Sequence, residues 1–378
     1  MEKSYLWRDS EGTWYLISED QDSVEIPEEN QDPARTPVYF KRKIDGGLGV
    51  PEKLNQEPQD DAVVSLEHAN ALTGLTITGF DWADNKAWAT AGRKLKKLKN
   101  LKQEIPITPL REFYKWLRFS LRNVKSGKEK LSLFLAEEYC RNSKPLETLF
   151  FDSLKAFKVF ENVDDAFHPL RNNKQYQEST SKGTTEIQKA VEESPLTFTD
   201  SETGRERTFR FVDREVSTTR VGSKTKNWIS REKSIRLDLL LAESINNNSR
   251  QMPIVGEIKY CDDATPFVAL IQAMTYATEL VTRPQWERLK KHCKGEHKKP
   301  IFTEWSADPS IGLLILAVNS PSKHEDVRKL TLNLLSELYK SKEFRKTIPT
   351  TVWLEATFAE GKIKLHGEKC RCFGNFQP

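Results

Sequence analysis

The chain contains few cysteines and no apolar run long enough to cross a membrane. Five cysteines occur among 378 residues, and an odd number at irregular spacing argues against the disulfide framework of a secreted domain. No apolar stretch reaches the roughly 18 residues that a membrane helix needs. The first residues, MEKSYLWRDSEG, lack the basic-then-apolar pattern of a secretory signal. These absences predict a cytoplasmic protein with no membrane partner.

Two further motifs are missing or weak. The glycine-rich segment DGGLGVPE at 45–52 is not followed by the Gly-Lys-Ser/Thr of a phosphate-binding loop, and no Walker sequence is present, so we predict that the protein is not an ATP-driven motor. A zinc site could draw on the late histidines and cysteines, but no Cys-x-x-Cys pair is present, so zinc is the weaker interpretation. The residues concerned are His292, Cys293, His297, Cys370 and Cys372.

The composition is that of a globular protein, and its charge is unevenly distributed. With 37% hydrophobic and 30% charged residues, the chain can bury a sizeable core, and its length suits two or three domains. The net charge is only +4. Residues 1–35, however, hold ten acidic and three basic side chains, whereas residues 93–102 hold six basic and no acidic ones. This asymmetry predicts that some faces meet a polyanion.

Hydrophobic periodicity divides the chain into three regions. Residues 1–83 are β-rich, with two strands within 4–17 around a Ser-Glu-Gly turn and a third at 38–43. Residues 84–175 show the spacing of amphipathic helices. A polar Ser/Thr/Gly-containing stretch then marks the boundary of a third region, 176–378.

The third region predicts an α/β domain with a central mixed sheet. The expected elements, in order, are a helix at 185–193, a strand pair at 207–220, two apolar strands around Asp238 and Glu257, a helix at 267–282, a buried strand at 312–318, a helix at 326–340, and a hairpin at 352–366 around Glu360-Gly361.

The two apolar strands contain the charged residues Asp238, Glu257 and Lys259, which are unusual in buried strands. Residues two apart in a strand share a face, so Glu257 and Lys259 point the same way while Ile258 points into the core. Burying such charges costs several kcal/mol unless they pair or bind a metal. Two acids and a lysine suit a divalent-cation site for phosphodiester hydrolysis. The alternative is a solvent-facing Asp238 beside a Glu257–Lys259 salt pair.

These residues resemble the PD-(D/E)xK nuclease superfamily, which has the restriction-endonuclease-like fold. The resemblance covers roughly the last two hundred residues and depends on Asp238 in RLDLLL and on Glu257 and Lys259 in VGEIKY. The family's Pro-Asp is Leu-Asp in this chain. The following Gln272-x-x-x-Tyr276 is similar to the helix motif of RecB-like and Cas-type members.

The resemblance implies a metal-dependent nuclease. Mg²⁺ or Mn²⁺ would be held by Asp238, Glu257 and the Ile258 carbonyl, with Glu186, in a segment that resembles the family's first helix, as a further ligand. Glu192 and Glu193 on the same helix compete with Glu186 for this role. Lys259 would orient or activate the attacking water.

Gln272 and Tyr276 lie one turn apart on a helix face. They would hydrogen-bond the lysine, the water or the nucleic-acid backbone.

Basic residues near the site and in the helical region are expected to contact phosphates of DNA. For the lysines at 93–102, a solvated helix face is an equal alternative. The expected phosphate contacts are Arg207, Arg210, Arg214, Arg220, Lys224, Lys226, Arg231, Lys94 and Lys97.

The sequence thus predicts a metal-dependent nuclease acting on DNA, in restriction or antiviral defence. Its N-terminal region would recognise, regulate or oligomerise, with a second copy or a partner protein. The alternative is an inactive nuclease-fold protein that binds nucleic acid or serves as a regulatory scaffold.

Overall fold

The computed structural model describes residues 4–8, 14–18, 39–43, 52–54, 73–75, 108–123, 128–157, 182–200, 203–218, 236–245, 250–261, 265–295, 299–302 and 309–374. The chain forms two compact units, Met1–Glu104 with Lys115–Gly127, and Ile105–Tyr114 with Lys128–Pro378. The helices at 128–157 therefore share a unit with the C-terminal sheet, although the sequence placed them in a separate region, 84–175.

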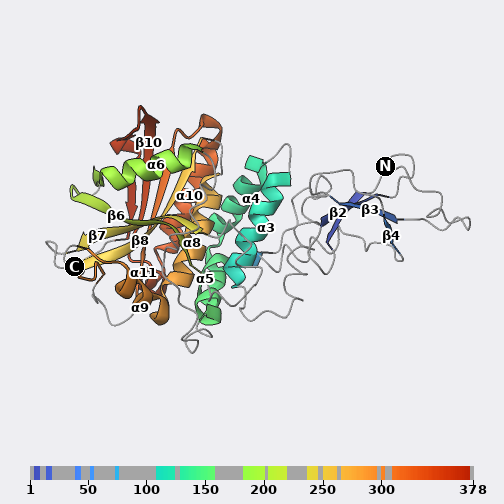
Figure 1. Ribbon diagram of the computed structural model, residues 1–378, viewed down its shortest axis with the longest axis horizontal. Coiled ribbons are helices and arrows are strands. Elements are labelled where there is room, and N and C mark those ends of the chain that lie inside the picture. The colour runs from blue at the N-terminus through green and yellow to red at the C-terminus, as the bar shows by residue number, and fades with distance from the viewer. Residues whose placement is uncertain are drawn as a thin grey trace, which may run out of the picture. The chain divides into compact units, whose positions relative to one another are not determined.

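The first unit contains a small antiparallel sheet (Figure 1). Its strands pair in chain order, and the hairpin expected within 4–17 is present, with Ser4 opposite Ser18. The short last strand is absent from the sequence prediction. The strands are β1 (Ser4–Arg8), β2 (Trp14–Ser18), β3 (Tyr39–Lys43) and β4 (Glu52–Leu54).

The second unit is built on a mixed sheet, as the sequence predicts. Among the described residues the strand order is β11-β10-β9-β8-β7-β6-β5, and β12 pairs with β10. The strands β8, β9 and β10 are parallel, and the other pairs are antiparallel. The strands are β5 (Leu196–Thr199), β6 (Glu206–Ser217), β7 (Arg236–Ile245), β8 (Arg250–Tyr260), β9 (Gly312–Val318), β10 (Thr351–Ala359), β11 (Lys362–Leu365) and β12 (Arg371–Phe373).

One expected element is different. Residues 207–220 were expected to form a strand pair, but β6 is a single long strand that pairs with β5 on one side and β7 on the other. The pairing of β6 with β7 shifts register between Phe211 and Asp213, as at a β-bulge, and the strand continues beyond the shift.

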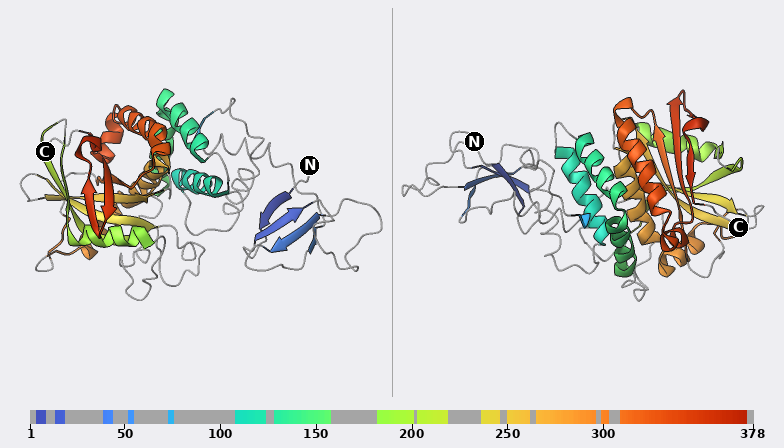
Figure 2. Two further views of the ribbon diagram at one scale, coloured as in Figure 1. Left: turned by 90° about the horizontal axis from the view of Figure 1, so that it is seen from above. Right: turned by 180° about the vertical axis from the view of Figure 1, so that it is seen from behind.

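Helices cover both faces of the sheet. Figure 2 shows α6 (Lys182–Glu193) on one face and α8 (Pro266–Leu280) with α10 (Glu325–Leu338) on the other. A further layer, α4 (Lys128–Arg141) and α5 (Lys144–Phe157), packs on α10 and α8. Because α8 lies between the sheet and this layer, all its residues are buried. None of the helices in the described ranges is both long and apolar enough to span a bilayer.

Three more α-helices and two short 3₁₀ helices, η6 (Ser322–His324) and η7 (Gly367–Lys369), lie in the described part of the chain. The helix α3 (Pro109–Asn123) contributes residues to both units, whereas α9 (Arg283–His292) and α11 (Lys342–Thr347) belong to the second. The hairpin predicted around Glu360-Gly361 is present. Both turn residues have positive φ, 51° and 75°, as a two-residue hairpin turn requires.

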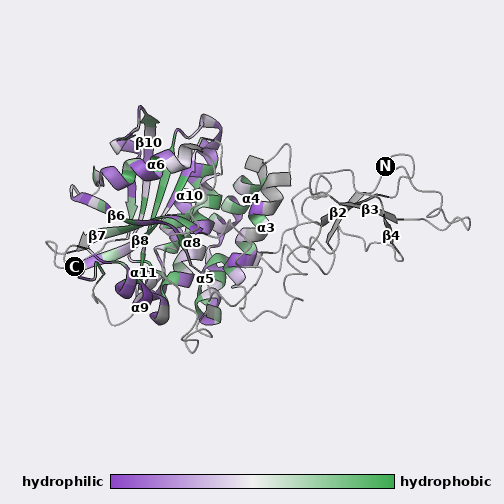
Figure 3. Cartoon of the chain, viewed as in Figure 1, coloured by the Kyte–Doolittle hydropathy of each residue, from purple (hydrophilic) through white to green (hydrophobic). Residues whose placement is uncertain are grey.

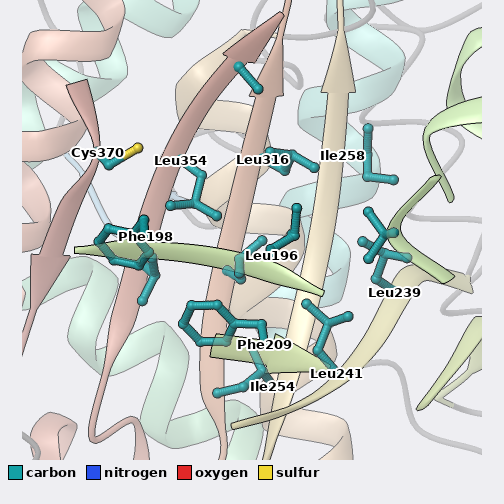
Figure 4. Packing of buried hydrophobic residues seen from close by; sticks show 14 of the residues in the cluster. Leu196, Phe198, Phe209, Leu239, Leu241, Ile254, Ile258, Leu316, Leu354 and Cys370 are labelled. Carbon is teal, nitrogen blue, oxygen red and sulfur yellow. The ribbon is translucent and has the colours of Figure 1, made fainter. Parts of the chain in front are cut away.

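The core between the sheet and α6 fixes which way the strand residues point. Leu239 and Leu241 of β7 and Ile254 and Ile258 of β8 belong to this core (Figure 4). Hydrophobic residues are concentrated along these central strands, whereas α9 is largely hydrophilic (Figure 3). Because side chains alternate along a strand, the residues between these core positions face α8. Glu257 is among them.

Candidate active site

The strands β7 and β8 bring the two predicted acids together. The antiparallel pairing of β7 with β8 places Leu239 opposite Gly256, and one further step along the same register places Asp238 opposite Glu257. Side chains of directly opposed residues start about 4.5–5.5 Å apart. The backbone N–H of Ile258 donates to Asp238 Oδ2 over 2.9 Å, which fixes this carboxyl group next to the other strand.

Lys259 lies in the same cluster, bonded to its neighbour on the strand and to α8. Its ammonium donates to Glu257 Oε1 over 2.7 Å and to Gln272 Oε1 over 2.9 Å. The amide nitrogen of Gln272 in turn donates to the Tyr276 hydroxyl over 3.1 Å. Glu257 is 1% exposed and Lys259 9%, so these charged groups meet in a largely water-free environment.

Burial disfavours the ionised form of Asp238. The residue keeps some solvent exposure, but its carboxyl group is enclosed by protein. Burial raises the pKa of Asp238 well above the usual range, and the neighbouring charge of Glu257 raises it further. The Lys259 ammonium and the Ile258 N–H oppose this shift. A carboxyl group in this state gains strongly from a cation.

A glycine allows the two strands to approach closely beside the acids. A Cβ atom added to Gly256 would lie 2.8 Å from the Cβ of Leu239 and 3.3 Å from its carbonyl oxygen. Real Cβ atoms do not approach a neighbouring Cβ so closely, so only glycine fits here without moving β7. The residue that precedes Glu257 therefore helps to set the spacing of the acid pair.

Two residues of α3 contact α8 at and next to the site residue Tyr276, and they are not among the site residues predicted from the sequence. Tyr114 packs edge-on against Tyr276, with ring centroids 6.4 Å apart. Arg111 forms a buried two-point ion pair with Glu279 and donates to Thr218 Oγ1 over 3.0 Å. The only signal in the sequence is the i, i+3 spacing of Arg111 and Tyr114 on an amphipathic segment, which matches that of Tyr276 and Glu279.

Glu186 does not join the acids, which corrects the expectation for α6. Its side chain is exposed, whereas Gln188, two residues further and so on the opposite side of the helix, is buried against the sheet. Gln188 Nε2 donates to the Asp238 carbonyl over 3.1 Å and to Glu215 Oε1 over 3.0 Å. The helix thus contacts the site strand through an amide.

One of the expected phosphate contacts is structural. Arg207 is buried, with Nε and Nη2 each 2.6 Å from a carboxylate oxygen of Glu243, so its guanidinium is not available to a nucleic acid. Arg210 is exposed, and Arg214 lies 3.8 Å from Glu192. The others lie outside the described residues, namely Lys94, Lys97, Arg220, Lys224, Lys226 and Arg231.

The chemistry of the donor set fits a hard divalent cation. Within the ranges that the structure describes, no group of three or more His, Cys, Asp or Glu side chains is placed to hold a metal. Mg²⁺, however, binds proteins through one or two carboxylates and keeps several waters. Asp238 and Glu257 supply that number. His297, one of the weaker zinc candidates, lies outside the described residues.

Comparisons with protein-family models, curated proteins and solved structures find no match to this chain. Its function is therefore inferred from its own sequence motifs and site geometry.

Proposed function

We propose that this chain is a metal-dependent nuclease of the PD-(D/E)xK type, and that its second unit has the restriction-endonuclease-like fold. The observation that carries the proposal is the meeting of Asp238, Glu257 and Lys259 on one side of two central strands. A mixed sheet with helices on both faces is consistent with that fold. The Gln272–Tyr276 pair extends the same cluster onto α8.

In the proposed site the two acids would hold Mg²⁺ or Mn²⁺, together with the carbonyl of Ile258. When bound, the ion lowers the pKa of a water molecule and offsets charge on the attacked phosphate. Asp238 must be deprotonated to act as a ligand, so the raised pKa of this carboxyl makes cation binding release a proton.

Lys259 is proposed to hold the attacking water and to stabilise the extra negative charge of the transition state. Gln272 orients it. Because the Gln272 amide nitrogen donates to Tyr276, its carbonyl oxygen is left to face the ammonium. Tyr276 therefore acts indirectly, by fixing which end of the Gln272 amide faces Lys259.

DNA is the proposed substrate, and restriction-like or antiviral defence the proposed setting. The exposed Arg210 on β6 is a basic side chain near the site strands. Contacts of this kind hold a phosphate backbone without reading its sequence.

The proposal is tested by incubating the purified protein with plasmid and linear DNA in Mg²⁺ or Mn²⁺. Cleavage should require the metal and should fall at least about 100-fold in Asp238→Asn, Glu257→Gln and Lys259→Met. The exposed Glu193→Gln on α6 serves as the matched control. Metal-independent cleavage would contradict the proposed metal dependence. Undiminished cleavage by Asp238→Asn and Lys259→Met would remove these residues from the reaction.

A further inference from the structure

Glu215 adopts a backbone conformation that is unfavourable for its residue type. Its φ is 52°, in the left-handed region, although it lies within the long strand β6. A residue with a Cβ atom loses free energy in this region. Such conformations persist where the surrounding structure holds them, and they occur preferentially at functional sites.

The strained residue lies directly beside the proposed metal ligand. The pairing of β6 with β7 places Arg214 opposite Leu239 and Val216 opposite Leu237. Glu215 and Asp238 lie between these two pairs and are not paired with each other. The irregular position of β6 therefore coincides with the acid of β7.

The conformation determines where the Glu215 carboxylate goes. Opposed residues of an antiparallel pair normally point to the same face, so an extended Glu215 would bring a third carboxylate toward Asp238 and Glu257. Instead, Glu215 Oε1 accepts a hydrogen bond from Gln188 Nε2 of α6 over 3.0 Å. The left-handed turn takes this charge away from the acid pair and directs it to the helix on the other face of the sheet.

The hydrogen bond to Glu215 sets the orientation of the Gln188 amide. Gln188 is only 3% exposed, and a carboxylate can only accept, so the amide nitrogen must face Glu215. The second hydrogen on the same nitrogen is then directed to the Asp238 carbonyl, 3.1 Å away. If the amide were reversed, its oxygen would oppose both acceptors.

We infer that Glu215 and Gln188 are positioning residues that hold the main chain of Asp238 in the register its carboxylate needs to bind a cation. This inference rests on the proposed function. Asp238 is fixed at two points, because Gln188 binds its carbonyl and the Ile258 N–H binds its carboxylate. Loss of the hydrogen bond from Gln188 should let the Asp238 carboxylate move relative to Glu257. Partners of metal ligands typically change metal affinity 10–100-fold.

The Glu215→Gly variant distinguishes the backbone strain at residue 215 from the role of its carboxylate. Glycine accepts the left-handed conformation at no steric cost, so the metal-free melting temperature should not fall, while the acceptor for Gln188 is lost. Titration calorimetry should show Mn²⁺ binding weakened about tenfold or more, and DNA cleavage should fall by a similar factor. Glu360→Gly is the matched control, because Glu360 has a φ of 51° in the exposed β10–β11 turn. It should leave Mn²⁺ affinity unchanged.

Two further variants keep the test decisive if glycine disturbs β6. Glu215→Asn tolerates positive φ but carries no charge, and Gln188→Met keeps the length of the side chain without its donors. Both should reproduce the loss of Mn²⁺ affinity in folded protein. Wild-type affinity in all three variants would overturn the positioning role and leave the nuclease proposal intact. A wild-type protein that neither binds Mn²⁺ nor cleaves DNA would overturn both.

Discussion

Asp238 combines burial with a neighbouring like charge, and this has a cost in the absence of metal. Its pKa is raised mainly by burial and then by Glu257. The folded state consequently holds a proton on this carboxyl more tightly than the unfolded chain does. By linkage, the stability that this proton contributes is complete below the ordinary carboxyl pKa and is lost as pH rises through the raised value.

Asp238→Asn should therefore stabilise the metal-free protein while abolishing cleavage. Asparagine removes the charge and can still accept from the Ile258 N–H. At pH 8 we expect a gain in unfolding free energy on the order of 1 kcal/mol or more. The difference from wild type should shrink as pH falls and should nearly vanish at about pH 3, below the ordinary carboxyl pKa of about 3.9, where the aspartate is mostly protonated in both states. Thermal and denaturant unfolding at both pH values measures this, and a variant less stable than wild type at pH 8 contradicts it.

At the scale of elements, the close pairing of β7 and β8 beside the acids depends on Gly256. Gly256→Ala would place a methyl group against the Cβ and carbonyl oxygen of Leu239, so β7 must shift at the point where it carries Asp238. We expect a loss of about 1–3 kcal/mol in stability and up to about a 100-fold loss in cleavage. Unfolding curves and cleavage rates measure the two effects.

Gly367→Ala is the control for this substitution. A Cβ atom added there meets nothing within 4 Å, so stability and cleavage should match those of wild type. If Gly256→Ala behaves like this control, the spacing of the two strands does not limit the site.

Much of the element order could be predicted from the sequence, because the apolar runs of β7, β8 and β9 and the helical spacing of α8 are strong local signals. The pattern also predicts that Glu257 and Lys259 share a face. That Gln188 rather than Glu186 faces the sheet could not be predicted, because it depends on how α6 is rotated against the sheet. Arg207 was misassigned because its partner, Glu243, lies 36 residues away and only pairing of β6 with β7 brings them together.

At the scale of the whole molecule, the sheet unit extends further toward the N-terminus than the motif residues suggest. Residues 105–114 and 128–157 belong to this unit, and the Arg111–Glu279 and Tyr114–Tyr276 contacts join α3 to the outer side of α8. Without them, a buried glutamate and the apolar surface of α8 would face water.

A chain truncated to residues 176–378 should therefore be markedly less stable than one spanning 105–378. Removing one partner of a buried ion pair alone costs about 3–5 kcal/mol, and the exposed apolar surface adds to this. Thermal unfolding and size-exclusion chromatography of the two chains compare them. Equal melting temperatures would show that 176–378 is a complete domain.

The most direct test of the account is the anomalous diffraction of crystals soaked in Mn²⁺. We predict a single strong peak between the carboxylates of Asp238 and Glu257, within about 2.0–2.4 Å of an oxygen from each. The same soak of Asp238→Asn crystals should give no peak there. An empty position between the two acids in the wild-type protein, or a side chain of Asp238 turned to the opposite face of the sheet, would contradict it.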